Sequence, residues 1–238
     1  TLFPYTTLFR SPDPAGQRFA LPAWIPGSYL IRDFARHIVA IDAQADGRPL
    51  ALAKIDKHTW QAPPTAGPIT VRCEVYAWDL SVRGAHLDTT HAFFNGSSVF
   101  LRVVGREQTP CRVVIEPPAG LAYRDWRVAT ALTPERATKA NGFGGYRAAD
   151  YDELIDHPVE MGEFTRLKFS ACDVAHEVVI TGKHDADLDR LGADLTKICA
   201  WQIGLFGEPA PMNRYVFLVS ALGEGYGGLE HRASTALV

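Results

Sequence analysis

The chain has 238 residues, 47% of them hydrophobic and 21% charged, a composition typical of globular proteins that excludes wholesale disorder. Its formal net charge of −3 comes without any block of like charge, so we expect no nucleic-acid partner. No apolar run reaches the roughly 18 residues that span a bilayer, so we also expect no membrane span. The four cysteines form no Cys-x-x-Cys pair, which disfavours a cysteine zinc site.

Both ends of the chain are unusual. Residues 1–11, TLFPYTTLFRS, have no initiator methionine and none of the charged and apolar regions of a signal peptide. They resemble the translation of a sequencing-library adapter, so we interpret them as an artefact that lies loosely on the fold. At the other end, residues 234–238 stop inside an apolar run. We therefore expect a fragment of a longer protein.

Short strand patterns separated by turn residues fill the chain from about residue 17 to residue 130. The clearest is 69–82, where apolar and polar residues alternate as they do in a half-buried strand. Asp46-Gly47 is a turn dipeptide. The other candidate strands are 36–42, 59–62, 99–104 and 112–116. This pattern predicts a mostly β N-terminal β-sandwich domain, to which we assign residues 12–160.

The pattern changes in residues 161–238. Candidate strands at 164–169, 174–180 and 214–221 surround a segment with helical spacing of apolar residues. Asp185 or Asp187 can cap the start of this helix, and Gly207 can end it. A strand, a helix and a strand predict the α/β start of a second domain, with too few elements to close a core of its own.

Two groups of residues could be mistaken for zinc sites. His176-Glu177 lacks a second histidine four residues after the first, because residue 180 is Ile, and its segment alternates like a strand. We interpret it as a pair on the protein surface. His86 and His91 lie in a segment rich in polar turn residues; they could bind a metal, but we favour a turn.

Two further segments could carry binding. Residues 24–34, WIPGSYLIRDF, are either a buried turn that anchors the sandwich or a loop whose Tyr29 or Arg32 faces a substrate cleft. In residues 227–231, GGLEH, Gly227 and Gly228 would let a peptide backbone approach closely, and the Glu230 carboxylate could hold an ammonium group. A plain glycine turn leading into a strand is the alternative.

Together four blocks resemble the glycyl aminopeptidase family of zinc metallopeptidases, over nearly everything after residue 11. They are 21–36, 74–83, 91–98 and 226–235, which read LPAWIPGSYLIRDFAR, EVYAWDLSVR, HAFFNGSS and YGGLEHRAST. The resemblance implies an N-terminal β domain, a thermolysin-like (gluzincin) catalytic domain and usually a PDZ domain. It implies removal of N-terminal residues from peptides, glycine and alanine being favoured, with zinc polarising the scissile carbonyl and a glutamate activating water.

The chain departs from this family in one respect, because the family's His-Glu-x-x-His helix is absent. We therefore expect no catalytic residue and no metal ligand here, and no zinc bound by this chain, although the full-length enzyme would hold it. The substrate-binding candidates that the resemblance leaves are Glu230, Gly227, Gly228 and, less directly, Tyr29. The alternative is a noncatalytic β-sandwich module that binds peptide or carbohydrate.

Overall fold

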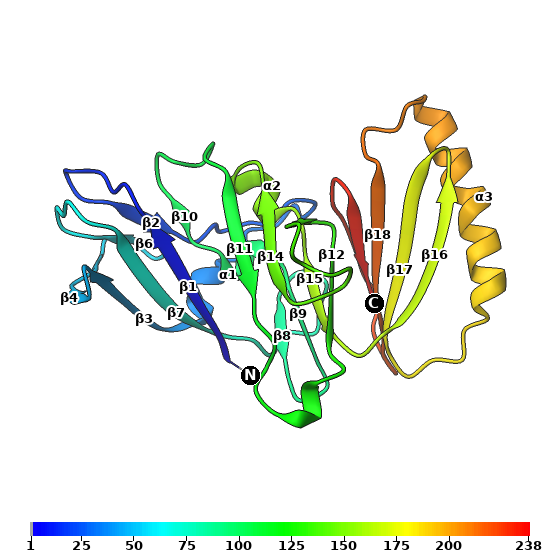
Figure 1. Ribbon diagram of the computed structural model, residues 1–238, viewed down its shortest axis with the longest axis horizontal. Helices are drawn as coiled ribbons and strands as arrows, with labels where there is room; N and C mark the ends of the chain where they lie inside the picture. The colour runs from blue at the N-terminus through cyan, green and yellow to red at the C-terminus, as the bar shows by residue number, and fades with distance from the viewer. Residues whose placement is uncertain (1) are drawn as a thin grey trace.

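The computed structural model describes residues 2–238. Figure 1 shows two parts side by side: strands β1 to β15 with two short helices, and strands β16 to β20 with one long helix on the outer face. The short helices are α1 (Gly96–Val99) and α2 (Tyr151–Ile155), and the long one is α3 (Leu188–Phe206). Single 3-10 turns occur at Phe34–His37 and Leu121–Tyr123. Among residues 2–238, no helix combines the length and apolar character that crossing a membrane requires.

The first part holds, within the described residues, four small antiparallel sheets rather than the two broad sheets of a simple sandwich. The first sheet is β1 (Leu2–Phe9), β7 (Ile69–Tyr76), β3 (Ile38–Ala45) and β4 (Arg48–Leu50). The second is β10 (Arg102–Val103), β2 (Arg18–Ala20), β6 (Thr59–Gln61) and β5 (Ala53–Lys54). The third is β11 (Cys111–Ile115), β14 (Gly144–Ala148) and β13 (Thr133–Pro134). The fourth is β12 (Arg127–Thr130), β15 (Val159–Gly162), β9 (His91–Phe94) and β8 (Ala85–Leu87).

The sheets are small because turn residues interrupt the chain every few positions. The predicted strand 69–82 ends at Tyr76, and the predicted strand 99–104 shrinks to two residues after α1. Asp46 and Gly47 both have positive φ, as a two-residue hairpin turn requires, and join β3 to β4. The expected β-rich character is therefore confirmed, and the single-sandwich arrangement is not.

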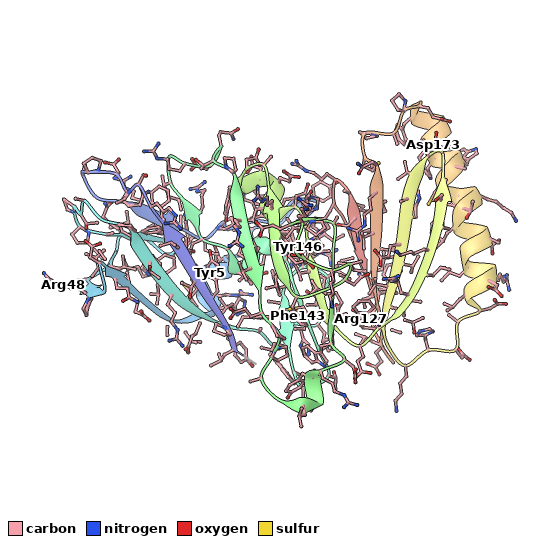
Figure 2. All side chains as sticks on the ribbon, viewed as in Figure 1. Tyr5, Arg48, Arg127, Phe143, Tyr146 and Asp173 are labelled. Atoms are coloured by element: carbon pink, nitrogen blue, oxygen red, sulfur yellow. The ribbon has the colours of Figure 1, made fainter. Side chains whose placement is uncertain are left out.

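The prediction that residues 1–11 lie loosely on the domain is wrong for the described part. β1 pairs with β7 from Leu2 opposite Tyr76 to Phe9 opposite Ile69. Phe3 is buried with its ring centroid 5.3 Å from that of Phe94. The Tyr5 hydroxyl accepts a hydrogen bond from the Leu101 N–H at 3.2 Å, and Figure 2 shows Tyr5 on this strand. Alternate side chains of the segment face inward, which is what a half-buried strand needs; its origin as an adapter stays a prediction.

The second part is a five-stranded mixed sheet. Its strand order is β16 (Thr165–Ala171), β17 (Val174–Gly182), β18 (Arg214–Ala221), β20 (Ser234–Leu237) and β19 (Gly228–Glu230). The pairs β17–β18 and β18–β20 are parallel, whereas the edge strands β16 and β19 are antiparallel to their neighbours. The predicted strand–helix–strand order is confirmed.

The α3 helix has the predicted ends. The Asp187 side chain accepts a hydrogen bond from the Arg190 N–H at 3.0 Å, and Gly207 with φ +97° follows the last turn. The helix lies over β16, and Gly192 allows it to approach Leu167. None of its residues is buried, and four large apolar side chains are exposed: Ile198, Trp201, Leu205 and Phe206.

One buried cluster joins the two parts. It contains Ile25, Phe34 and Val82 from the first part and residues of the mixed sheet that include Val179 and Leu229. The Arg127 guanidinium lies 4.1 Å from the Phe164 ring centroid at the connection, near the centre of Figure 2. The boundary that we predict between residues 160 and 161 falls inside β15, which pairs with β12 and β9 of the first part.

Candidate functional site

The glycine-rich segment forms an edge strand at the junction. Gly227 exchanges backbone hydrogen bonds with Val238, and the His231 N–H donates to the Ser234 carbonyl. Between these two positions, the backbone N–H and C=O groups of successive residues point alternately toward β20 and away from it. Those of Gly228 and Glu230 point away from β20. The Gly228 carbonyl accepts a long hydrogen bond from Arg83 Nη2 at 3.4 Å. The first part of the molecule therefore touches the outer edge of this strand.

The loop at residues 24–34 packs directly against the same strand. Gly27 has φ +81°, and a Cβ built on it would lie 2.7 Å from the Glu230 carbonyl oxygen and 3.0 Å from Leu229 Cδ1. The N–H groups of Arg32 and Asp33 bond to the Ala23 carbonyl and close the loop. The two segments that sequence analysis singled out separately therefore form one structure.

The Glu230 side chain is exposed at the end of β19. It forms no ion pair with any residue from 2 to 238. The arginines that could be expected to neutralise it are engaged elsewhere: Arg232, two residues along the chain, binds Asp156 at 3.0 Å, and Arg214 binds Glu177 at 2.7 Å. This carboxylate is consequently available to a ligand that carries positive charge.

The turn after Glu230 is held by contacts with the C-terminal end of α2. His231 is buried, and its Nδ1 lies 2.9 Å from Oδ1 of Asp156, the residue that ends α2. Burial by itself raises the pKa of Asp156, but hydrogen bonds from His231 and Arg232 outweigh it and lower that pKa below its usual value. His231 therefore positions the edge strand.

Tyr29 lies in the loop that packs on this strand but contributes no packed side chain. Its side chain is fully exposed, as is that of Tyr226 just before the glycines. Arg32 donates a 3.4 Å hydrogen bond to the hydroxyl of Ser28 within its own loop. Of the sequence candidates, Gly228 and Glu230 thus share β19 and Gly227 directly precedes it, whereas the role of Tyr29 stays a prediction.

A second cluster of functional side chains lies on the β8–β9 hairpin. His86 on β8, Asp88 in the turn and His91 on β9 each place a possible ligand atom within 4.8 Å of the other two. Three possible ligand atoms therefore converge on this hairpin, while the expectation that the chain holds no metal ligand stays a prediction. The sequence named His86 and His91 as a possible metal pair but favoured a turn, and it did not include Asp88. Only the pairing of the two hairpin strands brings the three positions together.

A buried carboxylate supports this cluster. Glu160 on β15 lies opposite β9, and its Oε1 is 3.0 Å from His91 Nδ1. Burial raises the pKa of Glu160 above the usual range, and the contact with Glu160 raises the pKa of His91 against the opposing effect of burial. The pKa of Asp88 is lowered. Burial raises it, but the hydrogen bonds from Thr90, His86 and the His91 N–H outweigh burial.

The pair His176-Glu177 is not on the surface, which corrects the sequence interpretation. Both side chains are buried in β17. The His176 ring stacks on Phe169 with centroids 4.7 Å apart, and Glu177 binds Arg214. β17 is covered on both sides, so its alternating pattern did not imply an exposed face. The pair has a structural role here.

Solved structures of metallopeptidases share this architecture. The chain aligns over 99% of its length, with a TM-score of 0.94 and 44% identity, with the crystal structure of an aminopeptidase N family protein from Idiomarina loihiensis, and covers 39% of that protein. The M1 zinc metallopeptidase from Deinococcus radiodurans aligns at TM-score 0.55 and 12% identity, over 98% of this chain and 55% of that one. A mutant of that enzyme, bound to a Tyr-Ser-Ala substrate, aligns at TM-score 0.54. At 12% identity the likeness concerns the fold alone.

The fold and these likenesses define a β-rich, peptidase-related N-terminal unit. The chain belongs to the family of the Peptidase M61 N-terminal domain, whose model matches residues 2–163 and so includes β1. Among curated proteins, none matches the chain.

The zinc of these neighbours does not fit the residues of this chain at the candidate substrate strand. A His-Glu-x-x-His segment is absent from the sequence, and the one His-Glu pair, His176-Glu177, is committed to packing and to Arg214. No reaction step can be derived from the residues around Glu230 alone.

Proposed function

We propose that this chain is the N-terminal part of a zinc-dependent aminopeptidase that removes N-terminal residues, glycine and alanine above all, from peptides. The β16–β20 sheet with α3 would be the start of its thermolysin-like catalytic domain, and strands β1 to β15 its β domain. The observation that carries the proposal is the exposed, unpaired Glu230 carboxylate at the end of a glycine edge strand, in a chain of the M61 N-terminal family.

An aminopeptidase must distinguish a free amino terminus from an internal peptide nitrogen. A fixed carboxylate does so, because a charge-assisted hydrogen bond to an ammonium group is stronger than any bond to a neutral amide. Glu230 has the required freedom, since Arg232 binds Asp156 and Arg214 binds Glu177. In the proposed enzyme Glu230 holds the substrate's ammonium group.

The strand that carries Glu230 is prepared for a backbone ligand. Gly227 and Gly228 bring no side chain to the edge, so an extended peptide can lie close to it. Arg83 and the loop around Gly27 already hold the carbonyl side of this edge. They fix the position of Glu230 rather than cover its carboxylate, which stays exposed.

The zinc of such an enzyme would be held outside this chain, so the chain alone would be inactive. The exposed apolar side chains of α3, Ile198 and Trp201 among them, are suited to be covered by the remainder of that catalytic domain. The share of the Idiomarina protein that the chain covers, 39%, is consistent with a large continuation, in which a PDZ domain would follow.

Reading the coding DNA beyond codon 238 tests the proposal. We expect a His-Glu-x-x-His codon set in frame within about the next hundred codons, and zinc-dependent release of glycine from free-amine peptides by the complete product. A stop codon directly after codon 238, together with binding of peptide or carbohydrate by the chain alone, would instead establish the noncatalytic binding module.

A further inference from the structure

The β8–β9 hairpin carries a metal-binding arrangement that is independent of the peptidase zinc. His86, Asp88 and His91 offer two imidazole nitrogens and one carboxylate oxygen within 4.8 Å of one another. Nitrogen ligands from histidine together with one carboxylate suit Zn²⁺, which accepts three protein ligands and a water.

The two carboxylate oxygens of Asp88 have different roles, one in the turn and one toward the proposed ion. Oδ1 of Asp88 accepts hydrogen bonds from Thr90 and from the His91 N–H, which fixes the turn. Its other oxygen, Oδ2, lies 3.1 Å from His86 Nε2. Two ligand atoms bound to one tetrahedral zinc at about 2.0–2.2 Å lie roughly 3.4 Å apart. Replacing the proton between Oδ2 and Nε2 by zinc therefore needs only a small movement.

The third ligand has an outer partner of the kind that metal-bound histidines have. His91 Nδ1 is held by the buried Glu160, 3.0 Å away, which leaves Nε2 as its ligand atom. His86 is only 2% exposed, and its Nδ1 has no hydrogen-bond partner among residues 2–238. The two imidazole rings lie with their centroids 5.1 Å apart, so both can face one ion.

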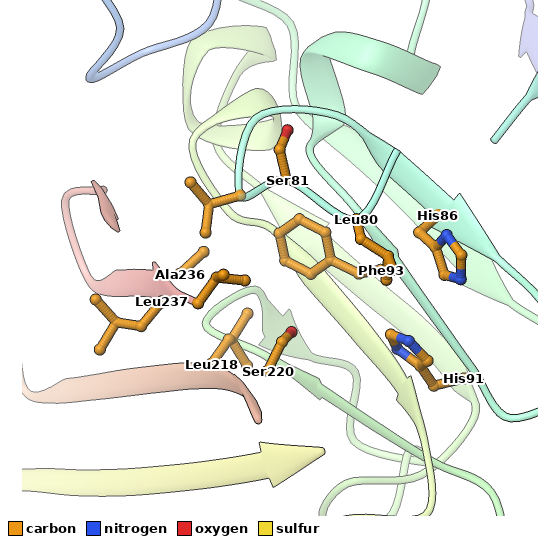
Figure 3. Close-up of a pocket in the computed structure, with 11 residues that line it drawn as sticks. Leu80, Ser81, His86, His91, Phe93, Leu218, Ser220, Ala236 and Leu237 are labelled. Carbon is orange, nitrogen blue, oxygen red and sulfur yellow. The ribbon is translucent and has the colours of Figure 1, made fainter. Parts of the chain in front are cut away.

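A small cavity lies beside the two histidines, between the hairpin and the mixed sheet. Figure 3 shows His86 and His91 on one side of it and Phe93, Leu218 and Ser220 on the other. Its volume is about 10 Å³, about the space of one water molecule. Both histidines of the cluster therefore border a space that can hold a water molecule.

We propose that His86, Asp88 and His91 form a zinc site with Glu160 as the outer partner of His91 and a water as the fourth ligand. All three ligands come from the β8–β9 hairpin, so the bound ion would tie its two strands and their turn together. This inference reverses the expectation that the chain alone binds no zinc.

The experiment uses the tag-free chain of residues 1–238, which contains no His-Glu-x-x-His segment to confuse the count. After dialysis against a chelator, zinc is titrated by calorimetry, and bound metal is counted by elemental analysis. We expect one zinc per chain with a dissociation constant in the micromolar range or tighter. Saturation at a hundredfold excess over that constant should raise the melting temperature by about 5–10 °C.

Variants assign the site. His91→Gln and Asp88→Asn should each weaken zinc binding at least tenfold, whereas His58→Gln, on the exposed β5–β6 connection, should bind like the unaltered chain. Circular dichroism reports whether each variant is folded. For a variant that fails to fold, Co²⁺ replaces zinc in the unaltered chain, where an intense visible spectrum indicates four-coordinate nitrogen and oxygen ligation. Absence of stoichiometric zinc, an octahedral cobalt spectrum, or equal binding by folded His91→Gln and the unaltered chain would overturn the proposal.

Discussion

Gly27 lies so close to Glu230 that no other residue fits in its place. A Cβ on residue 27 would come 2.7 Å from the Glu230 carbonyl oxygen, and the backbone there has φ +81°. The contact joins the loop of residues 24–34 to the strand whose carboxylate we assign to substrate binding. The position of Glu230 therefore depends on packing between the β domain and the mixed sheet.

Replacing Gly27 by alanine should cost more stability than its backbone conformation alone explains. Gly47 is the matched control, because it has φ +74° and nothing within 4 Å of an added Cβ. We expect Gly47→Ala to lower the free energy of unfolding by about 1 kcal/mol and Gly27→Ala by about 2–4 kcal/mol. Chemical denaturation of both variants measures the difference. Equal losses would mean that the loop moves away from Glu230 at no cost.

The packing of β1 can be tested by shortening one buried side chain. Phe3→Ala removes a ring that contacts Phe94, and we expect a loss of about 3–5 kcal/mol in the free energy of unfolding. Leu8→Ala, on the exposed face of the same strand, should cost less than about 0.5 kcal/mol. If both variants unfold like the unaltered chain, residues 1–11 contribute nothing to the fold, as their adapter-like sequence suggests.

Acid should weaken the connection between α2 and the turn after Glu230. The native pKa of Asp156 is lowered from 3.8, so the unfolded chain takes up this proton first as the pH falls. The stabilisation by Asp156 is complete above about pH 5 and is lost as the pH falls through the native pKa. The stability difference between the unaltered chain and Asp156→Asn should therefore shrink between pH 6 and pH 3.

Denaturant unfolding at several pH values measures that difference. Asp125→Asn removes an exposed carboxylate and is the control. If the difference in free energy of unfolding between the unaltered chain and Asp156→Asn stays constant from pH 6 to pH 3, Asp156 is not held by His231 and Arg232 as described.

Local patterns predicted the second part of the molecule well. The strand at 214–221 and the helix that Asp187 and Gly207 delimit have the expected bounds, because capping residues and periodic apolar positions act within one element. The sheets of the first part were harder to predict. Their pairing joins residues far apart in the chain, such as Leu2 with Tyr76, and no local pattern encodes such partners.

The candidate sites show the same division. The glycines and Glu230 were found because they are adjacent in the sequence, and nothing in the sequence indicated that Gly27 packs on them. Glu160 could not be connected with His91, because only the pairing of β15 with β9 makes them neighbours. The pair His176-Glu177 was predicted to lie on the surface but is buried. Burial depends on which elements cover a strand, and the residues of the strand alone do not reveal those elements.

In the proposed enzyme Glu230 recognises the free amino terminus of a peptide. The most direct test is Glu230→Gln in the complete enzyme, with kcat and KM measured on glycyl substrates with free and with acetylated amines, and Glu116→Gln as a distant, exposed control. Bound substrate would bury the pair of Glu230 and the ammonium group, and loss of one partner of a buried charge pair costs about 2–5 kcal/mol, so kcat/KM on the free amine should fall by tens to thousands of fold. The small activity on the acetylated substrate should stay the same. A folded Glu230→Gln enzyme that still prefers the free amine as strongly as the unaltered enzyme would contradict the assignment.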